Sequence, residues 1–150
     1  MENNMDGLLA AKVLLVDDEE EFIDLMSQRL ETRGLKVVTA SSGEEAVATV
    51  ADKSFDVAVV DLAMPGIDGI ETLILLKEER PDIEVIMLTG QATVKSGIEA
   101  MKHGANDFLE KPVDLNVLME KIWTAKRERM RTLDKKTQEE MKNILKSKSW

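Results

Sequence analysis

The chain has 150 residues, enough for one domain with a substantial hydrophobic core and a short appendage. It has no cysteine and a single histidine, His103, which excludes a disulfide framework, a thiolate metal site and a multi-histidine zinc site. Residues 1–125 carry 11 lysines and arginines against 25 acidic residues, and residues 126–150 carry 9 against 4, so we expect no nucleic acid to bind the acidic body.

Five short apolar runs are typical of strands. In chain order they are VLLV (13–16), LKVV (35–38), VAVV (57–60), VIML (85–88) and DFL (107–109). Most are rich in β-branched residues and do not alternate with polar ones, which indicates strands that are covered on both faces.

Segments with helical spacing separate these runs. The first places Phe22, Met26 and Leu30 at i, i+4 and i+8. In the second, Ser42 and Glu45 have the spacing of a capping box. The remaining helices are expected before Pro81, before Gly104 and after an N-cap at Asp114.

Strands and helices thus alternate five times. This order is typical of an open parallel sheet with helices on both faces, because parallel strands need a crossover connection that a helix supplies. The sequence therefore predicts a doubly wound α/β fold with a C-terminal helical extension.

Polar residues follow several of the predicted strands. They are Asp17, Asp18 and Glu19 after the first, Asp61 after the third, Thr89 after the fourth and Lys111 shortly after the fifth. Because the carboxyl ends of parallel strands share one edge of the sheet, we expect these side chains to lie close together. Converging carboxylates repel one another unless a cation joins them, and all-oxygen ligands suit Mg²⁺. A metal, a lysine and a hydroxyl beside a carboxylate nucleophile form a set that suits a phosphoryl group.

Several stretches together carry a specific family resemblance. VLLVDDEE, DVAVVDLAMPGIDGIETL, VIMLTG and GANDFLEKP resemble, in order and spacing, the receiver domain of two-component response regulators over about residues 11–130. The resemblance implies a five-stranded parallel sheet with the strand order 2-1-3-4-5. Residues 131–150 would then be a charged helical tail or linker.

By the same resemblance, Asp61 is the phosphoacceptor. It would take its phosphoryl group from the phosphohistidine of a histidine kinase or a histidine phosphotransfer protein. The only histidine, His103, lies at the end of the fourth predicted helix and is not a plausible phosphodonor. The donor must therefore be another protein or a small phosphoanhydride-like molecule. The chain would not be an enzyme in its own right but a phosphoacceptor that assists its own phosphorylation and dephosphorylation.

The resemblance also implies roles for the other residues of this edge. Thr89 and Lys111 would bind the phosphoryl oxygens, and the Lys111–Pro112 peptide bond would be cis. The implied Mg²⁺ ligands are Asp18, Asp61 and the backbone carbonyl of Ala63 directly, and Asp17 through a water molecule.

Two residues are expected to act as a switch. Thr89 would swing toward the phosphoryl group, and the aromatic residue of the fifth strand, here Phe108, would turn into the vacated space. Because Phe108 has no hydroxyl group, we hypothesise that it is biased inward even before phosphorylation.

In the family, the residues at the positions of Ala63 and Gln91 tune the rate of acyl phosphate hydrolysis. Because Ala63 is small and apolar, we expect neither an extreme lifetime of the acyl phosphate nor catalytic help from this residue in its hydrolysis.

Other interpretations of the acidic edge fit less well. Haloacid-type phosphatases need a second carboxylate two residues after the nucleophile, where this chain has Ala63. Flavodoxin-like cofactor binders place a Ser/Thr-rich loop after the first strand, where this chain has DDEEE, and there is no glycine-lysine P-loop motif. Taken singly, each aspartate could also be a solvated turn residue or a favourable charge at a helix N-terminus.

Beyond residue 125 the sequence contains no glycine or proline and favours a helix. Apolar residues recur there every eleven positions, in the series Met119, Met130, Met141 and the series Ile122, Leu133, Ile144. Eleven residues make three turns of a nearly straight helix, so one apolar stripe could continue from the fifth helix to the end. Either this stripe binds a second helix, from a twin chain or a partner, or the repeat is a coincidence in a frayed helix or disordered linker.

Two kinds of function remain open. In the first, the chain is a stand-alone switch that acts by binding a downstream protein; if the C-terminal helix pairs with a twin chain, the switch would be a homodimer. In the second, it is the receiver part of a longer regulator whose DNA-binding or enzymatic output domain is absent from this chain. No apolar run approaches the roughly 20 residues of a membrane span, and the N-terminus lacks a signal peptide pattern, so we expect a cytoplasmic protein without a membrane partner.

Overall fold

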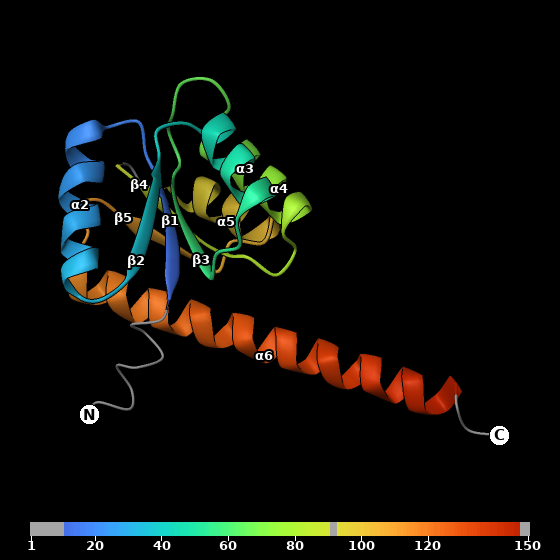
Figure 1. Cartoon of the computed structure of the whole chain (residues 1–150). Coiled ribbons are helices and arrows are strands. Elements are labelled where there is room, and N and C mark those ends of the chain that lie inside the picture. The colour runs from blue at the N-terminus through green and yellow to red at the C-terminus, as the bar shows by residue number, and fades with distance from the viewer. Residues whose placement is uncertain (1–10, 91–92, 148–150) are drawn as a thin grey trace.

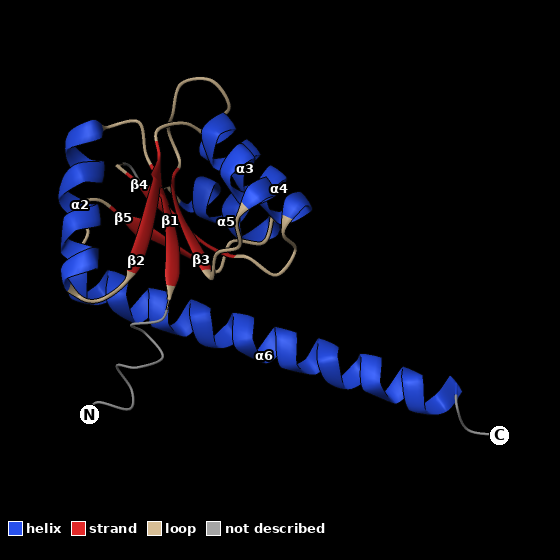
Figure 2. Ribbon diagram, in the orientation of Figure 1, coloured by secondary structure: helices blue, strands red, loops and turns tan. Residues whose placement is uncertain are grey.

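The computed structural model describes residues 11–90 and 93–147. Within these ranges five parallel strands form one sheet in the order β2-β1-β3-β4-β5 (Figures 1 and 2). The strands are β1 (Lys12–Val16), β2 (Lys36–Ala40), β3 (Val57–Asp61), β4 (Glu84–Thr89) and β5 (Asp107–Glu110). Every predicted strand and the strand order implied by the family resemblance are thereby confirmed.

Helices cover both faces of the sheet (Figure 1). α2 (Glu20–Thr32) and α6 (Leu115–Ser147) pack on one face, and α3 (Gly43–Asp52), α4 (Gly69–Glu79) and α5 (Val94–Lys102) pack on the other. Alternate side chains of β1 enter the two core layers, because Leu15 packs with α2 and α6 whereas Leu14 packs with α3 and α4. β3 and β4 are buried along their whole length, which explains why their sequences show no polar alternation.

The helix caps follow the predicted signals, with one exception. Asp114 caps α6 by accepting two N–H groups of its first turn. Ser42 accepts the N–H of Glu45 at 3.1 Å, but the Glu45 carboxylate accepts from the backbone and the hydroxyl of Ser41. Ser41 offers two donors to this carboxylate, so the predicted capping box at α3 is only half formed.

The longest helix, α6, runs without a break across the boundary expected near residue 130, and its C-terminal half extends beyond the sheet (Figure 1). Arg129 lies 2.7 Å from Asp56 and 2.9 Å from Asp82, and Lys126 lies 3.7 Å from Asp56. Asp56 and Asp82 precede β3 and β4, so these ion pairs hold α6 at the edge where the strands begin. Neither α6 nor any other helix in the described ranges combines the length and the apolar composition of a membrane span.

Candidate functional site

The polar residues that follow the strands meet at one edge of the sheet, as predicted. They are Asp17 after β1, Asp61 and Thr89 at the ends of β3 and β4, and Lys111 after β5. The register pairs Val16 with Val60, so the next residues of these strands, Asp17 and Asp61, are neighbours. The predicted convergence of carboxylates therefore follows from the alignment of the parallel strands.

The loop after Asp61 folds tightly back on the end of β3. Gly69, the first residue of α4, donates its N–H to the carbonyl of Leu62 at 2.8 Å. A Cβ atom at Gly69 would overlap the backbone of Asp61 and Leu62, so only glycine fits there. In the same loop the backbone N–H of Ala63 donates to the Asp61 carboxylate. This close packing fixes the position of the candidate phosphoacceptor.

Lys111 contacts three carboxylates of the acidic edge. Its Nζ lies 2.7 Å from Asp17, 3.2 Å from Glu19 and 3.8 Å from Asp61. The same ammonium lies 4.2 Å from the centre of the Phe22 ring. Burial by itself lowers the pKa of Lys111, but the hydrogen bond to Asp17 and the charges of Asp17 and Asp61 outweigh it, and the pKa is raised. The lysine is therefore a cation held beside the carboxylates.

Asp61 is buried among like charges, with 4% of its surface exposed. Burial, and then the charge of Asp17 and the weaker effect of Asp18, raise its pKa from 3.8 to about 6, against the opposing effects of Lys111 and the Ala63 N–H. At neutral pH the side chain is an anion whose charge is incompletely balanced. Such a group gains from sharing a cation and is available for reaction with an electrophile.

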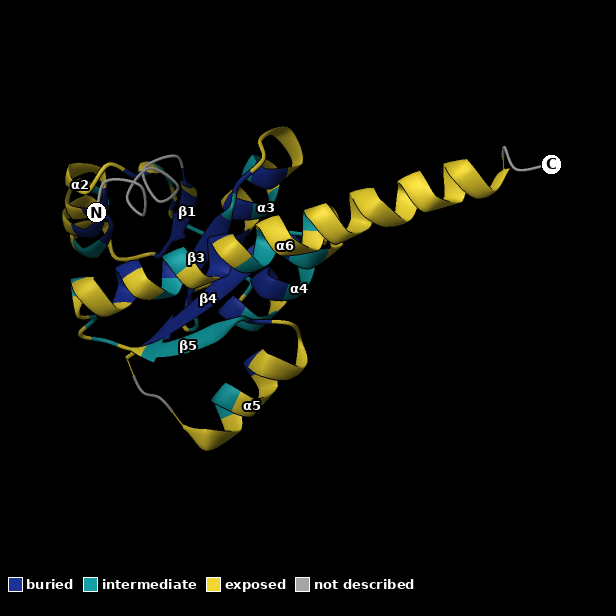
Figure 3. Cartoon of the chain, turned by 90° about the horizontal axis from the view of Figure 1, so that it is seen from below, coloured by how far each residue is buried: buried dark blue, intermediate teal, exposed yellow. Residues whose placement is uncertain are grey.

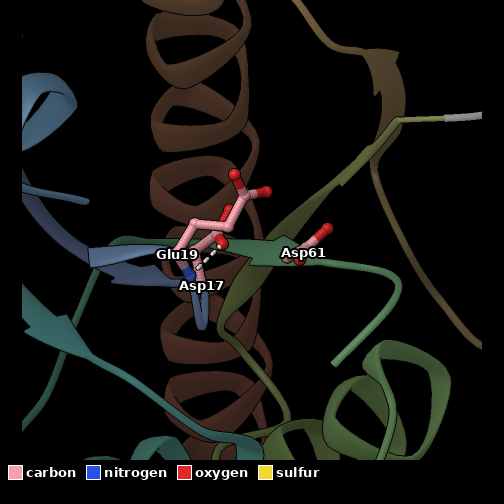
Figure 4. A group of neighbouring side chains, drawn as sticks. All are labelled: Asp17, Glu19 and Asp61. Atoms are coloured by element: carbon pink, nitrogen blue, oxygen red, sulfur yellow. Dashed lines mark hydrogen bonds between the residues drawn. The ribbon is translucent and has the colours of Figure 1, made fainter. Parts of the chain in front are cut away.

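Three carboxylates lie close enough to hold one cation. Oxygen atoms of Asp17, Glu19 and Asp61 all lie within 4.8 Å of one another. Figure 4 shows the side chains of Asp17 and Glu19 close together after β1 and that of Asp61 on the neighbouring strand. The backbone N–H of Glu19 donates to Asp17 at 2.9 Å, which folds this turn. An all-oxygen donor set with unbalanced negative charge fits Mg²⁺.

The other two expected ligands lie outside this group. Asp18 is exposed and contributes only its charge to the environment of Asp61. The Ala63 N–H is directed at Asp61, and nothing in the described residues tests its carbonyl as a ligand. Glu19 belongs to the group, although no metal role was assigned to it from the sequence. The roles of Asp18 and the Ala63 carbonyl as metal ligands stay predictions.

Thr89 and Lys111 are joined through their backbones. Thr89 is buried at the end of β4, and its carbonyl accepts the N–H of Lys111 at 2.7 Å. The Lys111–Pro112 peptide bond is cis, as the resemblance implied. The two residues expected to bind phosphoryl oxygens thus lie at the ends of the adjacent strands β4 and β5, at the same edge of the sheet as Asp61.

Phe108 lies on β5 at the side of α5. Its side chain is half-buried, packs on the core layer of α3, α4 and α5, and lies 3.8 Å from the Cβ position of Gly97. It also lines a shallow groove between α5 and β5. The inward bias of Phe108 stays a prediction, and Gln91 lies outside the described residues.

Comparison with known proteins identifies the family. Residues 13–123 match the response regulator receiver domain. The chain is 39% identical to the heme response regulator HssR of Staphylococcus haemolyticus over 111 residues, which are 74% of this chain and 49% of HssR. The chain therefore spans about half the length of this relative.

Two solved structures share the fold. The beryllofluoride-activated NtrC4 receiver domain dimer matches with a TM-score of 0.74 and 37% identity, over 79% of this chain and 98% of that one. A response regulator from Burkholderia pseudomallei, solved with a phosphorylated aspartic acid, calcium ion and citrate, matches with a TM-score of 0.72 and 28% identity, over 81% of this chain and 72% of that one. With its sheet order, its strand-end residues and these matches, the chain belongs to the response regulator receiver domain family.

Proposed function

We propose that this chain is a phosphorylation-activated switch of a two-component phosphorelay in which Asp61 accepts the phosphoryl group. The observation that carries the proposal is the environment of Asp61, a buried carboxylate with a pKa of about 6 that lies 3.8 Å from the ammonium of Lys111. The phosphorylated aspartic acid and calcium ion in the Burkholderia pseudomallei relative support it.

In the transfer, an oxygen of the Asp61 carboxylate attacks the phosphorus of a phosphohistidine. The phosphorus–oxygen bond forms, the phosphorus–nitrogen bond breaks, and the imidazole leaves with the bonding electron pair. A bound Mg²⁺ ion supplies positive charge at the transferred oxygens. Asp61 and Asp18 would hold the ion directly, with Asp17 acting through water, and Lys111 would exchange its contact with Asp17 for a phosphoryl oxygen.

Thr89 and Phe108 would respond to the phosphoryl group. The Thr89 hydroxyl would donate a hydrogen bond to a phosphoryl oxygen, and the Phe108 ring would move further into the space beside it. Because Phe108 lines the groove between α5 and β5, its movement would change the surface offered to a downstream protein. The switch would thus act by protein binding.

The proposed phosphodonor is a histidine kinase or a histidine phosphotransfer protein, and the proposed location is the cytoplasm. The chain would assist its own phosphorylation and dephosphorylation without acting on another substrate. We also propose that it forms a homodimer through α6. The dimeric state of the NtrC4 receiver domain is compatible with this.

A second candidate function is the receiver part of a longer regulator. It is favoured by the comparison with HssR, of which the matched region covers only 49%. In that case α6 would connect the receiver to a DNA-binding or enzymatic output domain. Determining whether the native reading frame continues beyond residue 150 separates the two candidates.

Phosphorylation with acetyl phosphate and Mg²⁺, followed by intact mass spectrometry, tests the proposal. We expect a gain of about 80 Da that disappears in Asp61→Asn and with EDTA. Asp52→Asn, which changes an exposed carboxylate at the end of α3, is the matched control and should gain the same mass. A mass gain that persists in Asp61→Asn would disprove Asp61 as the acceptor.

A further inference from the structure

The part of α6 that extends beyond the sheet carries an unpaired apolar stripe. Met130, Met141 and Ile144 expose 56%, 59% and 54% of their surface, and Leu133 between them is half-buried. Figure 3 shows that α6 is exposed along nearly all of this length. A single helix gains little stability in water without packing, so a stripe of this kind is typical of a helix that pairs with another.

This stripe lies on the side of α6 that faces its own domain. Five residues of the first half of α6 are buried, and three of them, Met119, Ile122 and Lys126, have exposed fractions of 7%, 0% and 8%. The corresponding residues eleven positions later are Met130, Leu133 and Thr137. Eleven residues are close to three full turns, so both sets point in nearly the same direction. The side that the domain covers up to Lys126 is therefore the side that opens to solvent from Met130 onward.

This geometry decides how two copies of α6 can pair. In a parallel pair each residue lies opposite its counterpart, so the partner's Met119 and Ile122 would occupy space that the domain already fills. In an antiparallel pair the partner's C-terminal half lies along Met130 to Ile144, and its domain lies past the far end of α6. We infer that two copies of this chain associate through an antiparallel pairing of their α6 helices, with Thr137 of each at the centre. The inference rests on the homodimer proposed above and adds its geometry.

Side chains along the stripe complement one another in this alignment. With Thr137 opposite the partner's Thr137, Met130 faces the partner's Ile144 and Leu133 faces the partner's Met141. Lys136 and Glu140 lie on the same flank of the stripe, so the partner's Glu140 lies beside each Lys136 and offsets the repulsion between the two Lys136 side chains, which are equally close. The two-fold symmetry forms each of these contacts twice, except the contact between the two Thr137 residues, which lies on the axis. A second copy of this chain thus supplies both the apolar surface and the charges that the exposed half of α6 requires.

The mass of the unphosphorylated full chain in solution is the first test. Sedimentation equilibrium should show a dimer, and Met141→Glu should raise the dissociation constant by about tenfold or more. Thr132→Glu introduces the same charge on the opposite side of α6 and should leave the dissociation constant within about twofold. A monomer at every concentration up to millimolar, or equal effects of the two substitutions, would overturn the inference.

Disulfide formation tests the orientation, because the chain has no cysteine of its own. An equimolar mixture of the Met130→Cys and Ile144→Cys variants should form a disulfide-linked heterodimer on mild oxidation, at a yield about tenfold above the homodimer yield of either variant alone. Met130→Cys alone giving as much linked dimer as the mixture would establish a parallel pair and overturn the antiparallel geometry. That result would leave both the homodimer and phosphorylation at Asp61 intact.

Discussion

β3 carries a carboxylate at each end, and the two differ in how completely they are paired. Asp56, just before the strand, lies 2.7 Å from Arg129 and 3.7 Å from Lys126, and it accepts a backbone N–H of β1 at 2.9 Å. Asp61, the last residue of the strand, lies 3.8 Å from Lys111 and has a pKa raised to about 6. Their side chains are 13% and 6% exposed, so burial alone does not account for the difference.

The difference lies in the number of cations for each carboxylate. At the start of β3, two cations of α6 approach Asp56, and the pairing fastens α6 to the domain. At the end of β3, Lys111 is shared between Asp61 and the carboxylates of Asp17 and Glu19. A matched carboxylate stabilises the structure, whereas a poorly matched one keeps an unbalanced negative charge, which suits the metal ion and the phosphoryl group proposed above.

Removing the charge of Asp56 should have the largest effect. Asp56→Asn leaves Lys126 without its carboxylate and Arg129 with Asp82 alone, so we expect the free energy of unfolding to fall by about 3 kcal/mol. Urea unfolding at neutral pH measures this loss. The exposed Asp52→Asn should change it by less than about 0.5 kcal/mol. A loss no larger than that of the control would show that the ion pairs of α6 are not structural.

Replacing the aspartate at the other end of β3 by asparagine should have the opposite effect and raise the free energy of unfolding. A pKa raised from 3.8 to about 6 means that ionised Asp61 destabilises the fold by about 3 kcal/mol above pH 6. An amide removes this repulsion but is itself incompletely hydrogen-bonded, so we expect Asp61→Asn to raise the free energy of unfolding by about 2 kcal/mol at neutral pH. A destabilised Asp61→Asn protein would refute the claim that the charge of Asp61 is poorly balanced.

The stabilisation by Asp61→Asn should disappear in acid. Because the pKa of Asp61 is higher in the folded than in the unfolded state, the wild type is destabilised fully above about pH 6. This destabilisation declines as the pH falls and is absent below 3.8, where both states are protonated. Urea unfolding of both proteins between neutral pH and about pH 4 should show the two stabilities converging. A constant difference would place the origin of the stabilisation elsewhere.

The fold could be predicted from the sequence because its signals are local. Each strand is a short apolar run, and the residue after it, such as Asp17 or Lys111, is assigned to the sheet edge by the parallel topology alone. The ion pairs of Arg129 with Asp56 and Asp82 could not be predicted. A charged helical segment with few apolar residues gives no signal of which acidic loops it will meet.

Within the site, the sequence could not decide which of several neighbouring residues makes a given contact. Whether Asp18 or Glu19 is the metal ligand depends on how the turn after β1 folds, and no rule of sequence spacing distinguishes the two residues. The contact of Phe22 with Lys111 was also missed, because the helical spacing of Phe22 indicates only a packing residue. Contacts of this kind depend on side-chain directions at the ends of elements, which a sequence pattern does not contain.

Mg²⁺ should help to balance the charge of Asp61 and so reduce the difference between the two carboxylates of β3. At ten times its dissociation constant, the ion should raise the free energy of unfolding of the wild type by about 1.4 kcal/mol. Asp56→Asn should gain the same amount, since Asp56 lies at the opposite edge of the sheet, whereas Asp61→Asn should gain less than half. Urea unfolding with MgCl₂ or EDTA measures this. An undiminished gain in Asp61→Asn would place the ion elsewhere.

The smallest expected difference concerns the acidic residue after β1 that completes the proposed metal site. The family resemblance implies Asp18, whereas the structure groups Glu19 with Asp17 and Asp61. The Glu19 side chain is 65% exposed and contacts Lys111, so it is better placed to balance the lysine than to hold an ion. We therefore expect Asp18→Asn to raise the Mg²⁺ dissociation constant about tenfold and Glu19→Gln about threefold or less, measured by calorimetric titration. The reverse order would assign the ligand position to Glu19, in which case the turn after β1 binds the ion in the arrangement that the structure already shows.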